Sequence, residues 1–87
     1  MSTAFNPVQS EVSVVFRFDA RGIAQRFRRN AAFAAVEALR EGETMRFVND
    51  QDPLPLVQQM TQRYGDRIAV RYVERGPDRV VLDIERT

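Results

Sequence analysis

The chain contains no cysteine and no histidine. It therefore lacks a thiolate nucleophile, an imidazole general base, the common zinc and haem ligands and any disulfide. All 13 cationic residues are arginine, so a lysine for Schiff-base or P-loop chemistry is absent too. Arginine binds anions well but rarely acts as a base. We expect a protein that is not an enzyme and that needs no metal and no cofactor.

The sequence also shows no leader segment, no membrane span and no strong net positive charge. Residues 1–10 have no basic start and no apolar core of a leader, and no segment reaches the roughly 18 apolar residues of a membrane span. We expect a cytoplasmic protein without membrane contact. The formal net charge of +1 is low for a dedicated nucleic-acid binder. Binding to nucleic acid would depend on local clusters of arginine.

The 87 residues are enough for one small domain, and the 44% hydrophobic and 29% charged shares are near globular averages. Collagen-like, coiled-coil and disordered chains are therefore disfavoured. We predict a flexible N-terminal lead-in over residues 1–10 and a single domain over residues 11–87.

Hydrophobic periodicity predicts four strands and two helices. Asp52 precedes Pro53, which predicts an N-cap followed by proline in the first helical turn. Gly42 and Gly65 are expected to end the helices. Strands are predicted from about 12 to 18, 43 to 48, 68 to 73 and 80 to 85, and helices from about 24 to 40 and 53 to 64.

The element order β-α-β-α-β-β predicts an α+β fold, a two-layer sandwich with a mixed four-stranded sheet and both helices on one face. Some apolar residues fall on the opposite face of the strands. An ordinary exposed sheet surface is the simpler interpretation, and a homodimer face is the alternative. These residues are Val15, Val48, Ala69, Val73 and Val81.

Several short motifs together resemble a known family. They are Asp19-Ala20-Arg21, Arg28, Phe33, Leu39, Gly42-Glu43, Val48-Asn49-Asp50-Gln51-Asp52-Pro53-Leu54-Pro55-Leu56 and Glu74-Arg75-Gly76-Pro77. The pattern is similar to domain of unknown function twenty-two forty-nine, an uncharacterised family of the TusA/SirA-like superfamily. The resemblance covers residues 12 to 86 and implies the same two-layer fold.

The chain departs from that family in informative places. TusA-like sulfur carriers have a Cys-Pro pair at the start of the first helix, so sulfur transfer is not expected in a chain without cysteine. The closer family often has two histidines where this sequence has Arg29 and Gln51, which removes the basis for a histidine-dependent metal or haem role. Relatives fused to haemerythrin-like domains, or in tandem copies, suggest a module that works beside another domain.

Charged residues are segregated between the first two connections. Residues 17–29 carry a local charge of +4, five arginines against one aspartate, and residues 37–52 carry −3, five acids against two arginines. If the first two strands are parallel, both connections meet at one edge of the sheet, where open α/β sheets bind ligands. The candidate binding residues are Asp19, Arg21, Arg28, Arg29, Asn49, Asp50 and Asp52.

Three interpretations of this edge stay open. A non-catalytic module that docks a protein partner is the leading one, with Arg29 as the residue most available for contact. The second is a site for an anionic ligand such as phosphate, a nucleotide or RNA, with Phe27 and Phe33 as stacking partners. In the third, Arg21 or Arg28 pairs with Asp50, and Asp50 or Asp52 caps the second helix, so that the two acids do not form an Asp-x-Asp metal clamp.

Overall fold

The computed structural model describes residues 14–87. The predicted lead-in over residues 1–10, and the start of the first predicted strand at Val12, lie outside the described residues. Two turns of 3-10 helix, η1 (Ala20–Gly22) and η2 (Gly65–Arg67), supplement the predicted elements. The strands are β1 (Val15–Asp19), β2 (Thr44–Asn49), β3 (Ile68–Arg75) and β4 (Val80–Arg86), and the helices are α2 (Gln25–Ala38) and α3 (Leu54–Tyr64).

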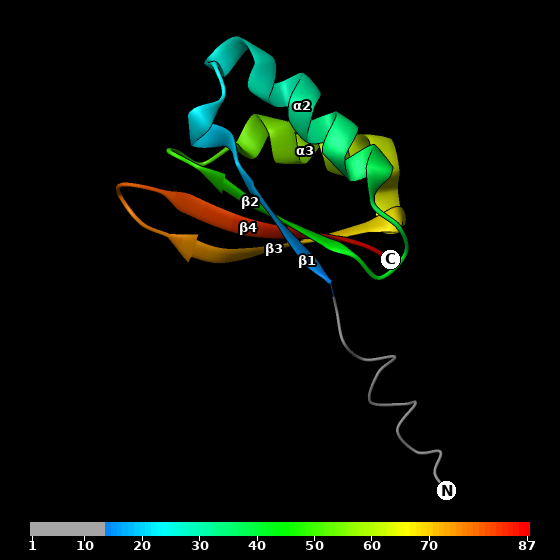
Figure 1. Ribbon diagram of the computed structural model, residues 1–87. Helices are drawn as coiled ribbons and strands as arrows, with labels where there is room; N and C mark the ends of the chain where they lie inside the picture. The colour runs from blue at the N-terminus through cyan, green and yellow to red at the C-terminus, as the bar shows by residue number, and fades with distance from the viewer. Residues whose placement is uncertain (1–13) are drawn as a thin grey trace, which may run out of the picture.

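The four strands form one mixed sheet in the order β1-β2-β4-β3. Strands β1 and β2 are parallel, whereas β4 is antiparallel to both β2 and β3. Both helices lie over the same face of this sheet (Figure 1). The α+β, β-α-β-α-β-β arrangement predicted from periodicity is confirmed. No helix in the described part of the chain is long and apolar enough to cross a membrane.

The core lies between the sheet and the two helices. Phe47 of β2 and Leu82 of β4 are opposite each other and are almost fully buried. Phe18 of β1 stacks on Phe47 with ring centroids 5.6 Å apart. The apolar stripes of the two helices face this layer, because Ala32, Phe33, Val36, Met60 and Tyr64 are all buried. Burial of these rows is the main favourable term for the fold.

Charged side chains form a hydrogen-bonded cluster on the helix-free face of the sheet. Asp83 of β4 accepts two hydrogen bonds from Arg46, at 2.9 and 3.0 Å, and one from Arg71 at 3.1 Å. The hydrogen bonds from Arg46 keep the pKa of Asp83 below its usual range, against the opposing effect of burial. Val48 and Val81 beside this row are buried. Within residues 14–87 the valines of this face therefore do not form one continuous apolar patch.

The ends of the helices differ from the prediction. Helix α2 ends at Ala38 and not near residue 40, because Leu39 already has an extended backbone (φ −67°, ψ 139°). Gly42, with a φ of 87°, belongs to the turn before β2 instead of the helix cap. Gly65, with a φ of 58°, does cap α3. Its positive φ is a conformation that glycine adopts without steric cost.

The prediction that Asp52 caps the second helix is wrong. Pro53 occupies the N-cap position of α3, and no side chain accepts a capping hydrogen bond there. The Asp52 carboxylate instead accepts a hydrogen bond of 2.6 Å from the Tyr72 hydroxyl. Asp52 therefore binds a residue of the distant strand β3 and not the nearby backbone N–H groups of α3.

Candidate functional site

The candidate site lies where β1 and β2 end. Because these strands are parallel, with Asp19 in register with Val48, their carboxyl ends are at the same edge of the sheet. The chain then enters η1 after β1 and the loop before α3 after β2. All seven predicted residues lie at the ends of these two strands, in the connections that follow them or in the first turns of α2. The tertiary contacts divide them into separate groups.

Asp19 and Arg21 form the first group. The Arg21 guanidinium donates two hydrogen bonds to the Asp19 carboxylate, at 2.8 and 2.7 Å, and the Arg21 backbone N–H adds one of 3.1 Å. The side-chain hydrogen bonds from Arg21 are the main reason that the pKa of Asp19 lies far below its ordinary value. Asp19 also caps η1 through the backbone contact. The charge of Arg21 is thus balanced by a neighbour two residues away.

Arg28, Asn49 and Asp50 form the second group. The Arg28 side chain donates to the Ile23 carbonyl at 2.7 Å, to Asn49 Oδ1 at 3.1 Å and to Asp50 Oδ1 at 3.0 Å. Asn49 in turn donates from Nδ2 to the Gln51 carbonyl at 2.9 Å. Only 13% of the Arg28 side chain is exposed. These contacts, which we call the Arg28 clamp, join the two connections.

Arg29 has a different environment although it is adjacent in sequence. Its side chain is exposed, and its Nε donates a hydrogen bond of 2.5 Å to Gln59 of α3. A weaker contact of 3.5 Å reaches Asn30. The guanidinium carbon lies 5.0 Å from the centroid of the Phe33 ring. Within residues 14–87 these hydrogen-bond partners are neutral amides, so they leave the positive charge of Arg29 uncompensated.

Asp52 forms the third group with two residues of β3. The Tyr72 hydroxyl donates to Asp52, and the guanidinium carbon of Arg75 lies 3.8 Å from the centroid of the Tyr72 ring. Burial, followed by the hydrogen bond to Asp52, raises the pKa of Tyr72. Sequence analysis missed this role of Tyr72. The only signal was that Tyr72 carries a hydroxyl in an otherwise apolar row. A buried tyrosine hydroxyl usually has a hydrogen-bond partner, which predicts an acceptor nearby.

Between these groups lies a hollow with a volume of about 270 Å³, which we call the edge hollow. Apolar side chains and amide side chains both line it. The sequence analysis named Arg28, Arg29, Asn49 and Asp52, and the structure adds two glutamines from the helices. The lining residues are Gln25, Arg28, Arg29, Phe47, Asn49, Gln51, Asp52, Pro53, Pro55, Leu56 and Gln59.

Other sequence hypotheses can be placed against this geometry. Asp50 and Asp52 have different partners, and residues 14–87 contain no group of three or more acidic, histidine or cysteine side chains that could hold a metal ion. Phe33 is only 8% exposed, so it is not available to stack on a base. Phe27 is 53% exposed, and the guanidinium carbon of Arg26 lies 4.6 Å from its ring centroid.

The Glu74-Arg75-Gly76-Pro77 motif has a structural explanation. It turns the chain from β3 to β4, and the Gly76 N–H donates to the Arg79 carbonyl at 2.9 Å. The Glu74 carboxylate accepts hydrogen bonds of 3.1 to 3.2 Å from Arg79, which lower its pKa. This motif stabilises the hairpin.

Comparison with known proteins gives one result. Residues 17–86 match the model of a family described as "Uncharacterized conserved protein (DUF2249)". Comparison with the curated proteins and with the solved structures gave no match. The matched segment runs from the middle of β1 to the end of β4 and includes the Arg28 clamp, Arg29 and the edge hollow. The chain therefore belongs to the uncharacterized DUF2249 family.

Proposed function

We propose that this domain is a non-catalytic, TusA-like docking module that binds a protein partner at the edge hollow, with Arg29 as its charged contact. The proposal depends mainly on one observation. Two of the three candidate arginines are paired with carboxylates of the chain, Arg21 with Asp19 and Arg28 with Asp50. Arg29 is left as the cation beside a hollow of mixed apolar and amide character.

This lining suits a protein side chain better than a phosphate group. Tight phosphate sites use several charge-assisted donors directed at one point. Here the Arg28 guanidinium is already bonded within the clamp, whereas Pro55 and Leu56, which are less buried than Phe47 and Pro53, offer apolar contact. Docking surfaces typically combine such an apolar centre with a few polar groups and arginine. An acidic or amide-bearing side chain of the partner would complement Arg29 and Gln59.

Two finer parts of the proposal come from the sequence. The element order supports placement in the TusA/SirA-like superfamily, and the absence of cysteine argues against sulfur transfer. The cytoplasmic location expected from the sequence stays a prediction, and cell fractionation tests it.

A crosslinked pull-down with matched charge reversals tests the docking site. Arg29→Glu changes the hollow, whereas Arg63→Glu changes an exposed arginine of α3 that also lies near the Phe33 ring but outside the hollow. We expect wild type and Arg63→Glu to capture the same protein and Arg29→Glu to lose it. Equal loss in both variants would indicate a general charge effect and would contradict docking at the hollow.

An anion site at the same edge is the second candidate. Helix α3 starts at the hollow without a side-chain cap, so backbone N–H groups of its first turn lack a side-chain acceptor. Titration with inorganic phosphate, ATP and a short RNA, followed by NMR, tests this candidate. Shifts at Leu54, Leu56 and the Arg29 side chain would support it, and unmoved peaks at about millimolar ligand, the weak end of specific affinity, would eliminate it.

A further inference from the structure

Among residues 14–87, strand β1 has one side without a partner strand. It is the first strand in the sheet order, and the carbonyl of Val14, just before it, accepts a hydrogen bond of 2.9 Å from the Thr44 N–H. Backbone groups of successive residues in a strand point to alternate sides. The N–H and C=O groups of Val15 and Arg17 therefore point away from β2. No strand of the described part of the chain pairs with them, so a strand of another chain could do so.

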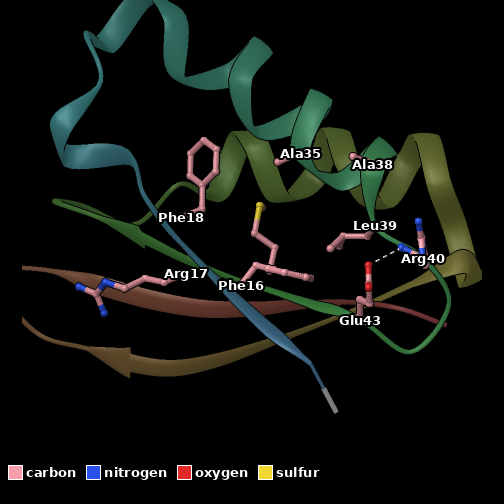
Figure 2. Close-up of a pocket in the computed structure, with 9 residues that line it drawn as sticks. Phe16, Arg17, Phe18, Ala35, Ala38, Leu39, Arg40 and Glu43 are labelled. Carbon is pink, nitrogen blue, oxygen red and sulfur yellow. Dashed lines mark hydrogen bonds between the residues drawn. The ribbon is translucent and has the colours of Figure 1, made fainter.

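The side chains at this edge are unusually apolar for an exposed position. Val14, Val15 and Phe16 are 48%, 45% and 49% exposed. Beside them, between β1 and the C-terminal half of α2, lies a groove of about 540 Å³. Its apolar lining comprises Phe16, Phe18, Ala35, Ala38, Leu39 and Met45. Figure 2 shows Phe18 pointing from β1 toward α2, while Arg17 points away from the helices.

The opposite edge of the same sheet is protected against strand pairing. Strand β3 contains a register irregularity between Tyr72 and Glu74 and carries Arg71, Glu74 and Arg75. Bulges and charged side chains are the usual means by which edge strands avoid pairing. Strand β1 has a regular register along its whole length. Of the two edges, only β1 combines regular geometry with a run of exposed apolar residues.

We propose that β1 pairs with β1 of a second copy of this chain, antiparallel, with Phe16 opposite Phe16 at the two-fold axis. The two four-stranded sheets then continue as one sheet with all helices on the same face. This surface is separate from the edge hollow, so the proposal stands or falls independently of the proposed function.

Charge and overlap favour this register over those centred on Arg17 and Phe18. A two-fold axis at Arg17 would place Arg17 opposite Arg17, which is unfavourable for like charges in directly opposed positions. An axis at Phe18 pairs only residues 17–19 of β1 with themselves, because η1 begins at Ala20. With the axis at Phe16, residues 14–18 all pair. Val15 then lies opposite Arg17, and both have outward backbone groups that form the hydrogen-bonded pairs.

The helix beside the groove leaves room for a second copy. Ala34 and Ala38 of α2 are exposed, and Ala35 and Ala38 line the groove. Their short side chains allow a neighbouring helix to approach closely. Antiparallel pairing about an axis perpendicular to the sheet brings α2 of the second copy to the same side. Helix α2 of the second copy then covers the apolar groove.

Sedimentation equilibrium of the full chain tests the proposal. We expect a concentration-dependent change from the monomer mass to twice that mass. Val15→Lys should raise the dimer dissociation constant at least about tenfold, since it puts charge at an apolar edge. Val73→Lys is the matched control, because Val73 is equally exposed (43%) but lies on β3. It should leave the dissociation constant unchanged.

Several results would overturn the inference. They are a monomer at every concentration, equal weakening by Val15→Lys and Val73→Lys, and weakening by Val73→Lys alone. A monomer whose β1 amide signals shift on addition of an unrelated strand-forming peptide would assign the edge to a foreign partner and would also overturn it.

Engineered cysteines test the register, and the chain has no native cysteine to interfere. Phe16→Cys should form a disulfide-linked dimer on mild oxidation, since the two residues are directly opposed across a non-hydrogen-bonded pair. Arg17→Cys and Phe18→Cys should crosslink much more slowly. Fastest crosslinking at Arg17 or Phe18 would contradict the proposed register. Thermal unfolding of each variant verifies that it folds.

Discussion

Arg28 and Arg29 are adjacent in the sequence and opposite in their surroundings. Arg28 is 13% exposed and is bonded to a backbone carbonyl, an amide and a carboxylate. Arg29 is exposed, and its hydrogen-bond partners are the neutral amides of Gln59 and Asn30. One residue stabilises the junction of two connections, and the other presents a charge at the edge hollow.

The helix explains this difference. Successive residues of an α-helix are rotated by about 100° around its axis, so neighbours cannot face the same surroundings. Arg28 faces the end of β2, where Asn49 and Asp50 supply acceptors, and Arg29 faces α3. A pair of arginines in a sequence is therefore not evidence for two binding residues. The acceptors that each one meets decide its role.

The largest expected effect is on Arg28. Arg28→Ala leaves the Ile23 carbonyl and Asn49 without their donor in a part-buried site, which should cost about 2 to 3 kcal/mol of the free energy of unfolding. Urea denaturation measures this loss. Arg29→Ala is the control on the next residue. Similar losses of unfolding free energy in Arg28→Ala and Arg29→Ala would contradict the different structural roles of the two arginines.

Arg46 is a third arginine whose role is set by its acceptor, because it pairs with Asp83 on the helix-free face. Asp83→Asn should lower the free energy of unfolding at neutral pH by about 1 to 2 kcal/mol, because charge-assisted bonds to a buried carboxylate are weakened. The pKa of Asp83 is depressed in the folded state. Its contribution is therefore present above about pH 4, its unfolded value, and is lost as the pH falls through the folded value.

Denaturation across the acid range tests this sign. Wild type should lose stability on acidification more steeply than Asp83→Asn. Some slope should remain in the variant, because the pKa values of Asp19 and Glu74 are depressed as well. A variant with the same acid slope as wild type would show that Asp83 does not carry the expected linkage.

A smaller effect is expected on the Asp52 side of the hollow. Tyr72→Phe removes the hydroxyl that donates to Asp52 and should cost about 1 kcal/mol. Burial and Asp52 raise the pKa of Tyr72, so the neutral hydroxyl is favoured in the folded state. This stabilisation is present below about pH 10 and is lost as the pH rises through the folded value.

Denaturation at pH values on either side of about 10 measures the alkaline effect. Tyr64→Phe provides the comparison, since Tyr64 donates to Glu37 at 2.8 Å outside the hollow. Both variants should lose stability, but only Tyr72→Phe should also change binding at the hollow. An effect of Tyr64→Phe on binding as large as that of Tyr72→Phe would contradict the position of the site.

The smallest change in stability is expected for Arg29→Glu. An exposed side chain with neutral partners should alter the free energy of unfolding by no more than about 0.5 kcal/mol. Partner affinity should nevertheless fall at least about tenfold if Arg29 is an interface anchor. Calorimetry for binding and urea denaturation for stability separate the two. A large loss of stability would assign Arg29 to the same structural role as Arg28.

Much of this fold could be predicted from periodicity, and the misses share a cause. The alternation in β2 and the apolar stripe through Phe33 and Val36 correspond to the buried rows of the structure. Asp52 was misassigned, because the rule for helix caps considers only nearby residues. The Tyr72 hydroxyl that binds Asp52 lies 20 positions away. No local pattern contains that information.

The candidate site was predictable as a location but not as a set of contacts. Parallel β1 and β2 place their ends at one edge, which brings Asp19, Arg28 and Asp50 to the same region. Which arginine binds which carboxylate depends on the rotation of α2 and the path of each loop. The glutamines Gln25 and Gln59 had no signal in the sequence, since exposed glutamines are common on helices. They line the hollow only because the start of α2 and the middle of α3 both border it in the tertiary structure.

The sequence by itself determined the element order, the two-layer α+β fold and the absence of cysteine and histidine chemistry, because these depend on residue type and local periodicity. The tertiary structure decided that Arg28 forms the clamp and that the charge of Arg29 is not paired with a carboxylate of the described residues. It also decided that β1 is the unprotected edge of the sheet. The reason is physical. Electrostatic partners, burial and strand neighbours are set by which distant segments come within hydrogen-bond reach.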